Sequence, residues 1–420
     1  MVAIVAGGKL GLINGSGNVL GSRGQLGSAS EGRLGTGVTV NAASGNLVIQ
    51  NRDEVLTGVG LDSVFMRTYN SLGQFNDDNG DNWRESPQRS VVFEPDNTAQ
   101  SAVLRTDWDG SIVKYTWDAG RLAFVSKEGA GAYDTITLSG STWTWTDGST
   151  QQTEMYDKAN GGRITVTRDA DSNQLTYSYD TNGRLIKVQT TNVFGGVASQ
   201  NGEYTALTWD ASSNNLTKME TFNPGNSSPL VTRVRYTYAG NRLSTVNIDL
   251  TPSDNTNSDS NSVTLSYAYD PISGRVSSIR EYANSDTATY DYVPFVSFTY
   301  ALVGSDYRVA SVSEAGSDGG IRTTNFAYDT VKRITTVTDS LGKATRLAYD
   351  ASGNLTSITS PADGNGNASA VTQFAYNGNG DLLSSTDGLG NISTYTYDAN
   401  GNLLTSTDAA GNVTRNEYDC

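Results

Sequence analysis

The sequence predicts an all-β protein in which antiparallel strands form one continuous curved sheet built from repeated units. A tyrosine-aspartate motif recurs along the chain, which is the mark of a repeat architecture. Residues before each motif alternate between apolar and polar types, as expected of strands with one covered face. No segment shows an apolar stripe with the helical period, so we expect little helix.

The repeated unit contains an aromatic residue, any residue, Tyr and Asp, followed by a glycine and then Arg or Asn before Leu or Val. Its clearest copies are Tyr179, Asp180 and Gly183; Tyr269, Asp270 and Gly274; Tyr349, Asp350 and Gly353; and Tyr397, Asp398 and Gly401. Near the end of the chain Asp329, Asp350, Asn377, Asp398 and Asp419 are separated by 21, 27, 21 and 21 residues. One unit is therefore 21 residues long, and the longer step holds a Gly/Asn-rich stretch typical of a surface loop.

Each motif predicts a strand, a tight turn and a return strand. The aspartate should accept hydrogen bonds from nearby backbone N–H groups, and Gly183, Gly353 and Gly401 should have positive φ. The return strand is ambiguous because Leu185 and Val188 are three residues apart, which a flat strand would place on opposite faces. Either a bulge shifts the register or both faces are covered.

Composition excludes several functions. The net charge of −15 disfavours nucleic acid as a partner, because an acidic surface repels phosphates. The chain has no histidine, which removes the usual near-neutral general base and histidine-based zinc sites, and no carboxylate pair is nominated by spacing. The single cysteine, Cys420, forms no disulfide framework, no apolar run is long enough to span a membrane, and no classical signal peptide is visible. We therefore expect no enzyme, no catalytic residue and no cofactor.

Three regions follow from these patterns. Residues 1–37 form a Gly/Ser-rich N-terminal arm that should dock on the remainder, residues 38–175 form a divergent β-rich region, and residues 176–420 carry the repeats, with the last unit cut short. A hairpin is predicted at Val38–Asn41 and Leu47–Gln50 around the turn 43–46, and a strand at 141–146.

The repeats resemble the YD repeats of the Rhs protein family, which includes bacterial polymorphic toxins, components of insecticidal toxin complexes and animal teneurins. The resemblance covers about 176–420, and the stretches 40–48, Asp53-Glu54 and 67–73 look like the start of bacterial Rhs proteins. It implies a spiral β-sheet closing as a hollow shell that often holds a toxic C-terminal region. The self-cleavage segment that follows the repeats in such proteins is absent before Cys420, so the chain resembles an N-terminal fragment that lines part of a shell and encloses nothing.

The resulting hypothesis is a non-enzymatic scaffold of a secreted or surface protein, whose partner is a C-terminal toxin or effector region of the same polypeptide. One alternative is an adhesin that binds cell-surface glycans through exposed aromatics, and another is a carboxylate-based glycosidase. The motif tyrosines either pack as ladders or bind sugar rings or cargo, and Arg184, Arg242, Arg275 and Arg333 either lie along rings and turn carboxylates or recognise a ligand.

A weak calcium site is also conceivable from the sequence. Asp77, Asp78 and Asp81 surround Gly80 with hard oxygen ligands, although the spacing differs from that of an EF-hand loop. The alternative is a tight polar turn before Trp83.

Overall fold

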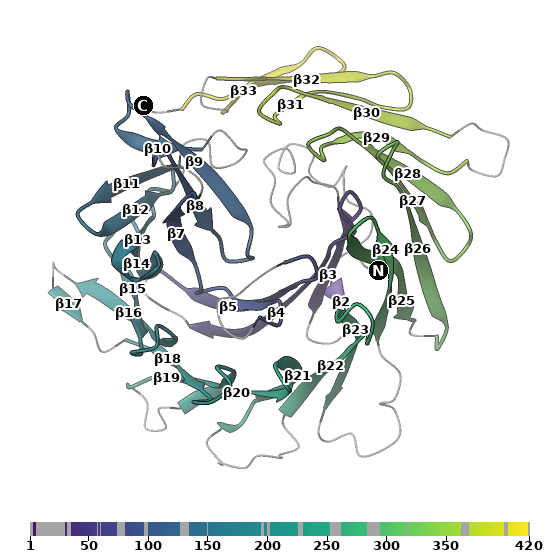
Figure 1. Ribbon diagram of the computed structural model, residues 1–420. Helices are drawn as coiled ribbons and strands as arrows, with labels where there is room; N and C mark the ends of the chain where they lie inside the picture. Colours follow the sequence, from purple (N-terminus) through teal and green to yellow (C-terminus); the bar gives the residue numbers. More distant parts are fainter. Residues whose placement is uncertain are drawn as a thin grey trace.

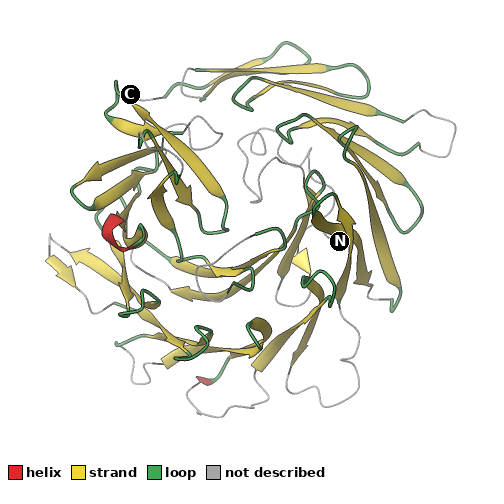
Figure 2. Cartoon of the chain, in the orientation of Figure 1, coloured by secondary structure: helices red, strands yellow, loops and turns green. Residues whose placement is uncertain are grey.

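In the computed structural model nearly all regular structure is β-strand (Figure 2), which confirms the predicted fold class. The structure describes residues 3–5, 30–31, 35–56, 58, 60–73, 80–95, 100–126, 134–148, 150–194, 197–199, 202–225, 230–252, 262–283, 295–316, 318–362, 369–398 and 402–418. The strands form two sheets rather than the one predicted: a small sheet near the N-terminus, and a long sheet that curves around it (Figure 1).

The small sheet, here called the inner sheet, has the order β1-β3-β4-β5-β6, with β2 paired to β3. Its strands are β1 (Ala3–Val5), β2 (Ser30–Glu31), β3 (Thr36–Asn41), β4 (Leu47–Leu56), β5 (Ser63–Asn70) and β6 (Trp83–Glu85). The predicted hairpin is β3–β4, which pairs Val38 with Ile49 and Val40 with Leu47. All four side chains lie on one face of the hairpin and are buried, and Thr39 and Val48 on the other face are buried as well.

The long sheet begins as a closed eight-stranded barrel. Its strands are β7 (Ser90–Phe93), β8 (Ala102–Thr106), β9 (Ile112–Asp118), β10 (Ala123–Val125), β11 (Thr135–Ser139), β12 (Thr142–Thr146), β13 (Thr153–Asp157) and β14 (Arg163–Arg168), with the 3₁₀ helix η3 (Lys158–Asn160) after β13. Closure occurs where Arg163 of β14 pairs with Ser90 of β7, and the N–H of Val91 donates to the carbonyl of Gly162 (2.8 Å). The predicted strand at 141–146 is β12, whose Trp143 and Trp145 are buried in the barrel.

The sheet continues from β14 into a long arc, here called the wall. Its strands are β15 (Gln174–Tyr179), β16 (Leu185–Phe194), β17 (Val197–Ser199), β18 (Tyr204–Trp209), β19 (Leu216–Phe222), β20 (Leu230–Ala239), β21 (Arg242–Asp249), β22 (Ser262–Tyr269), β23 (Val276–Ala283), β24 (Val296–Val303), β25 (Asp306–Ala315), β26 (Ile321–Asp329), β27 (Ile334–Thr338), β28 (Ala344–Tyr349), β29 (Leu355–Thr359), β30 (Val371–Tyr376), β31 (Leu382–Thr386), β32 (Ile392–Tyr397), β33 (Leu403–Thr407) and β34 (Val413–Arg415). Successive strands pair antiparallel, except that β17 extends β16 as a side hairpin and β16 pairs onward with β18. In Figure 1 the wall curves around the inner sheet.

A recurrent bulge resolves the ambiguity of the return strands. In β15–β16 the register shifts between Ser178 and Tyr179, so that Leu185 lies opposite Tyr179 and Val188 opposite Tyr177. The extra residue brings Leu185 and Val188 to the same buried face. The same shift precedes the second tyrosine or tryptophan of the motif in β18, β20, β22, β24, β28, β30 and β32.

The expectation that this chain encloses nothing is wrong. The concave side of the wall holds the inner sheet, formed by residues from the first part of the same chain (Figure 1). The sequence predicted one divergent β-rich region over residues 38–175; in the structure most strands of this region belong either to the inner sheet or to the barrel. Of the N-terminal arm, the described parts β1 and β2 both add to β3.

Candidate functional site: the concave face of the wall

In nine motifs the second aromatic residue forms a ladder that ties successive repeats together. Its polar group donates a hydrogen bond to a carbonyl in the strand that precedes the motif, whereas the buried hydroxyl of Tyr349 makes no such bond. The bonds run from Tyr179 to Ile164 (2.6 Å), Trp209 to Leu185 (2.7 Å), Tyr238 to Leu216 (2.9 Å), Tyr269 to Leu243 (2.7 Å), Tyr300 to Val276 (2.6 Å), Tyr328 to Val309 (2.7 Å), Tyr376 to Leu355 (2.8 Å), Tyr397 to Leu382 (2.8 Å) and Tyr418 to Leu403 (2.8 Å). These nine second aromatics therefore join successive repeats through hydrogen bonds within the long sheet.

Loss of one hydrogen bond of the ladder, here called a rung, should lower the free energy of unfolding by a small, measurable amount. Tyr397→Phe removes the hydrogen bond to Leu382 and is expected to destabilise the wall by about 0.5–1.5 kcal/mol, the usual net value of one intramolecular hydrogen bond. Tyr395→Phe on the same strand is the matched control, because Tyr395 is not a rung and lies opposite Ser406. Urea unfolding of both variants tests this, and equal costs would contradict the ladder.

The turns have the geometry that the motif predicts. Gly183 and Gly353 have φ of +85° and +83°, and Gly274 has φ of +71°. One carboxylate oxygen of Asp180 accepts from the N–H groups two and four residues later, and Asp350 repeats this arrangement. Asp270 accepts from the N–H groups two and three residues later, and Asp398 accepts from the N–H of Asn402. Gly401 lies outside the described residues.

Three of the four arginines singled out from the sequence contact a ring or a turn carboxylate, as predicted. Arg184 pairs with the turn carboxylate of Asp180 (2.7 Å), and the Arg242 guanidinium lies 5.4 Å from the centre of the Tyr269 ring. Arg275 lies 5.3 Å from the Tyr307 ring and donates to the carbonyl of Ser71 in the inner sheet (3.0 Å). Arg333 lines a cavity of about 200 Å³ between the wall and Ala43 of the inner sheet.

The wall contacts the turn between β3 and β4 of the inner sheet mainly through the main-chain carbonyls of that turn. Thr335 donates its hydroxyl to the carbonyl of Ala42 (2.6 Å), and Arg308 donates to the carbonyl of Ala43 (3.2 Å). The N–H of Val309 donates to the carbonyl of Gly45 (3.0 Å). At Gly45, φ is +72° and an added Cβ would lie 2.3 Å from the Cβ of Arg308, so this turn requires glycine to reach the wall.

Aromatic and ionic groups complete the contact further along the wall. The N–H of Val276 donates to the hydroxyl of Tyr69 (3.1 Å), and the indole of Trp83 donates to the hydroxyl of Tyr269 (3.0 Å). Asp53 and Arg67 form a fully buried ion pair in the inner sheet (3.2 Å).

This ion pair is bound to the wall by two tyrosines. Tyr236 donates to Asp53 (2.8 Å), and Arg67 donates to the hydroxyl of Tyr267 (3.1 Å). Burial raises the pKa of Asp53, although Arg67 and Tyr236 act in the opposite direction, and burial raises the pKa of Tyr236 far above its usual value. Tyr236 therefore remains a protonated donor to Asp53.

A second ionic cluster fills the small barrel. Glu154 lies between Arg89 and Arg105, with 2.9 Å to Arg105, and accepts a hydrogen bond from Tyr156. Burial alone would raise the pKa of Glu154, but the two guanidinium groups outweigh it and hold that pKa below its usual value. The Arg105 guanidinium also lies 4.0 Å from the centre of the Trp145 ring. Its neighbours thus hold Glu154 as an anion, and its role is to stabilise the barrel.

Asp134 at the edge of this barrel predicts a dependence of stability on pH. Burial raises its pKa to about 6 from 3.8, against the hydrogen bond from Gly148. The folded chain therefore retains this proton longer than the unfolded chain, so the stabilisation is complete below about pH 4 and is lost as the pH rises through about 6. Asp134→Asn should stabilise the protein above pH 6 by about 2–3 kcal/mol relative to its effect at pH 4. Urea unfolding of both proteins between these pH values tests this, and a difference that does not change with pH would contradict it.

The calcium hypothesis remains a prediction. Asp77 and Asp78 lie outside the described residues, while the carboxylate of Asp81 accepts from the N–H groups of Trp83 and Leu243. Among the described residues, no group of three or more Cys, Asp or Glu side chains is placed to hold a metal ion. The described helical segments include none with the length and apolarity required to cross a membrane.

Sequence reasoning missed the residues that dock the inner sheet. Asp53 and Arg67 were noted only within stretches that carry the family resemblance. The available signal was an arginine between Phe65 and Tyr69 in an apolar alternating strand, a position where a charge must be paired when buried.

Comparison with known proteins agrees with the repeat pattern. The RHS Repeat family matches residues 156–197, 328–372 and 376–413, and a family described as Domain of unknown function (DUF6531) matches residues 37–115. No curated protein matches the chain.

Solved structures of toxin complexes show a weak likeness. A crystal structure of TcdB2-TccC3-Cdc42 is 13% identical with a TM-score of 0.30, and the match covers 93% of this chain and 21% of that one. The Tc holotoxin pore of Photorhabdus luminescens is 12% identical with a TM-score of 0.31, covering 90% of this chain and 26% of that one. This chain thus spans about a quarter or less of those chains.

The RHS matches fall on β13–β17, β26–β30 and β30–β34, most of them wall strands with the recurring turns, bulges and tyrosine rungs. On this evidence the chain is a protein that carries Rhs/YD repeats.

Proposed function

We propose that this chain is a non-enzymatic part of the β-shell of a secreted or surface Rhs protein, which encloses and delivers a C-terminal toxin or effector region of the same polypeptide. The observation that supports this is the inner sheet: the wall already holds folded polypeptide on its concave side. The wall binds it through hydrogen bonds to main-chain carbonyls of the turn 42–45 and through two tyrosines bonded to the buried ion pair of the inner sheet.

Limited proteolysis of the protein together with its downstream region tests this proposal. The downstream region should be cleaved at least tenfold more slowly with the wall present than after deletion of residues 176–420. The downstream region alone is the control, because it shows whether resistance is its own property. Equal cleavage in all three proteins would refute the proposal.

The adhesin alternative remains a prediction. Most motif rings are at least partly buried, whereas Trp117 is 45% exposed and Tyr418 is 41% exposed, so these two aromatics are the more accessible for sugar stacking. Glycan-array binding that is lost in Trp117→Ala would favour the adhesin. The glycosidase alternative would need turnover that depends on one carboxylate.

A further inference from the structure

The repeat that contacts the inner-sheet turn departs from its neighbours. The turn between β26 and β27 contains no glycine, and Arg333 has φ of +53°, a left-handed conformation that is uncommon for a residue with a side chain. The pairing of β26 with β27 also lacks the register shift of the neighbouring motifs, so Thr335 lies opposite Tyr328. In the next repeat the shifted register places Leu355 opposite Tyr349. The departure therefore puts a hydroxyl where the next repeat has a buried leucine.

Three hydrogen-bond donors beside this turn have no acceptor. The hydroxyl of Tyr349, a residue that is 8% exposed, and the Nε of Arg308 are buried and have no partner in the described part of the chain. The guanidinium of Arg333 likewise makes no ion pair or hydrogen bond with the described residues. All three residues line the cavity of about 200 Å³ between the wall and Ala43. Buried donors without acceptors are rare in folded proteins, so this cavity presents donors for which the described chain supplies no acceptor.

The proton of the Tyr349 hydroxyl is available to a ligand. Burial raises the pKa of Tyr349, and Thr335 acts in the opposite direction, so the hydroxyl stays protonated at neutral pH. Thr335 itself donates to the carbonyl of Ala42 (2.6 Å). The hydroxyl of Tyr349 therefore faces the cavity as a donor.

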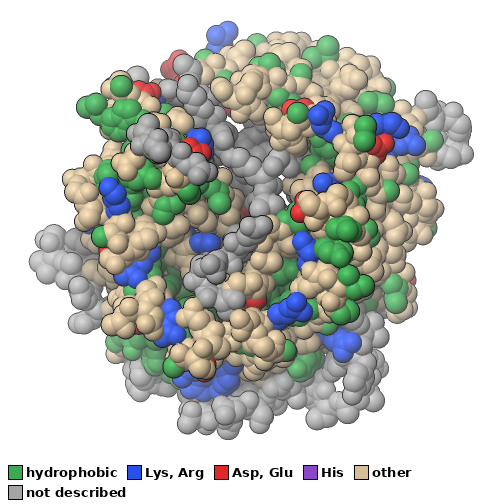
Figure 3. Space-filling model, viewed as in Figure 1, with side chains coloured by type: hydrophobic (Ala, Val, Ile, Leu, Met, Phe, Trp, Pro, Cys, Tyr) green, Lys and Arg blue, Asp and Glu red, His purple; other side chains and the backbone are tan. Residues whose placement is uncertain are grey.

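The charges around the cavity favour an anion. Asp350 lines it, but both of its carboxylate oxygens already accept hydrogen bonds within its own turn. Asp329 also lines it and pairs with Lys332 (3.5 Å). The three cations Arg308, Arg333 and Lys332 thus stand against two carboxylates. Although the chain has a net charge of −15, Lys and Arg side chains recur along this part of the ring (Figure 3).

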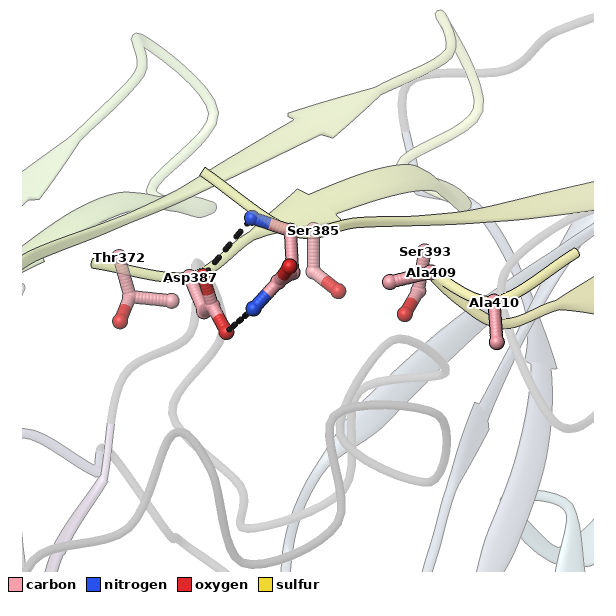
Figure 4. A pocket seen from close by; sticks show the side chains of 7 residues that line it. Thr372, Ser385, Asp387, Ser393, Ala409 and Ala410 are labelled. Atoms are coloured by element: carbon pink, nitrogen blue, oxygen red, sulfur yellow. Dashed lines mark hydrogen bonds between the residues drawn. The ribbon is translucent and has the colours of Figure 1, made fainter. Parts of the chain in front are cut away.

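A larger recess further along the wall lacks these features. It measures about 730 Å³ and lies between Thr372 and Ala410 (Figure 4). Its carboxylate, Asp387, accepts from the N–H and the side-chain amide of Asn391 (2.9 and 2.8 Å). None of the described residues that line it is basic. An anion would find no counter-charge there.

A ligand that satisfies the donors of the smaller cavity needs several acceptor oxygens. A carboxylate offers about four lone-pair sites, and carboxylates and phosphates match the planar guanidinium with two parallel hydrogen bonds. We propose that this cavity binds a small oxyanion, a carboxylate or a phosphate group, through the Tyr349 hydroxyl, the Arg308 Nε and the Arg333 guanidinium. Arg333 is exposed and gives access from solvent, whereas Tyr349 is the buried end. Because Ala43 lines the same cavity, the bound ion lies where the wall meets the inner sheet.

Calorimetric titration of the chain with inorganic phosphate, and separately with malonate, tests this site at constant ionic strength. Tyr349→Phe should weaken binding about fivefold or more, because it removes a donor and keeps the ring. Tyr328→Phe is the matched control. It keeps the ring that Arg308 lies against (5.3 Å) in the same cavity, and the hydroxyl that it removes donates to the carbonyl of Val309 (2.7 Å), so affinity should stay within about twofold. Binding of malonate alone would identify a carboxylate ligand, and binding of phosphate alone a phosphate group.

The arginine at the mouth of the cavity gives a second measurement. Arg333→Gln should weaken binding about tenfold, whereas Arg322→Gln removes the same charge from an exposed pair with Asp318 (2.8 Å) and should have no effect. The bound ion should also slow the modification of Arg333 by phenylglyoxal, a reagent for guanidinium groups, and leave that of Arg322 unchanged.

The results that overturn the site are specific. Binding of neither ion overturns it, and so does binding that Tyr349→Phe weakens no more than Tyr328→Phe. Equal weakening by Arg333→Gln and Arg322→Gln would show attraction by net charge alone and would also overturn it. Neither result bears on the proposed container, which protease protection of the downstream region tests separately.

Discussion

Removal of the Asp53 carboxylate is expected to destabilise the folded chain by about 3–5 kcal/mol, the typical cost of breaking a buried ion pair from one side. In Asp53→Ala the Arg67 guanidinium, whose side chain is 1% exposed, would remain buried without its counter-charge. Tyr236 would lose the acceptor of its hydroxyl at the same time. Both losses fall on the contact between inner sheet and wall, so hydrogen exchange in β4 and β5 should rise together with the fall in the urea midpoint.

Two controls separate this effect from general damage. Asp53→Leu combined with Arg67→Met removes both charges and should recover most of the stability, because a buried pair is often replaceable by apolar residues. Glu94→Ala breaks the surface pair with Lys114 (2.7 Å) and should cost less than about 1 kcal/mol. A cost for Asp53→Ala as small as that for Glu94→Ala would show that the ion pair does not hold the inner sheet.

The sequence predicted those features that depend on neighbours in the chain. Alternation before Tyr179 and the pair Asp180 and Gly183 define a strand and its turn within a few residues, and both are present. The return strand was left open because Leu185 and Val188 suit either a bulge or two covered faces. The bulge decides which residues share a face, so the buried partners of the motif aromatics could be assigned only from the register of the folded sheet.

Features that depend on distant pairing could not be predicted. Arg67 meets Tyr267 across 200 positions and Thr335 meets Ala42 across 293, and no local pattern specifies such partners. For the same reason a single sheet was expected where the chain forms two. Barrel closure is another distant event, because it depends on Gly162 meeting Val91.

Gly162→Ala is therefore expected to be among the most damaging single changes, costing about 4 kcal/mol or more, whereas Gly161→Ala should cost about 1–2 kcal/mol. The two glycines are adjacent and both have positive φ, +69° and +75°, so they share the strain that a side chain meets in that conformation. The two glycines differ in the space available for a side chain. An added Cβ at Gly161 meets nothing within 4 Å, whereas at Gly162 it would lie 1.9 Å from the carbonyl oxygen of Val91.

Relief of that clash must move β7 away from β14, because the obstacle is main chain and cannot rotate aside. The movement would break the bond from Val91 to Gly162 (2.8 Å) and the bond from Ile164 to Arg89 (3.2 Å). It would also draw Arg89 away from Glu154, leaving that buried carboxylate with one of its two guanidinium partners. Urea unfolding measures the difference in the free energy of unfolding between the two variants. Hydrogen exchange at the N–H groups of Val91 and Ile164 shows whether the pairing of β7 with β14 has opened. An equal loss of stability in Gly161→Ala and Gly162→Ala would mean that the barrel does not depend on the close contact between β7 and β14.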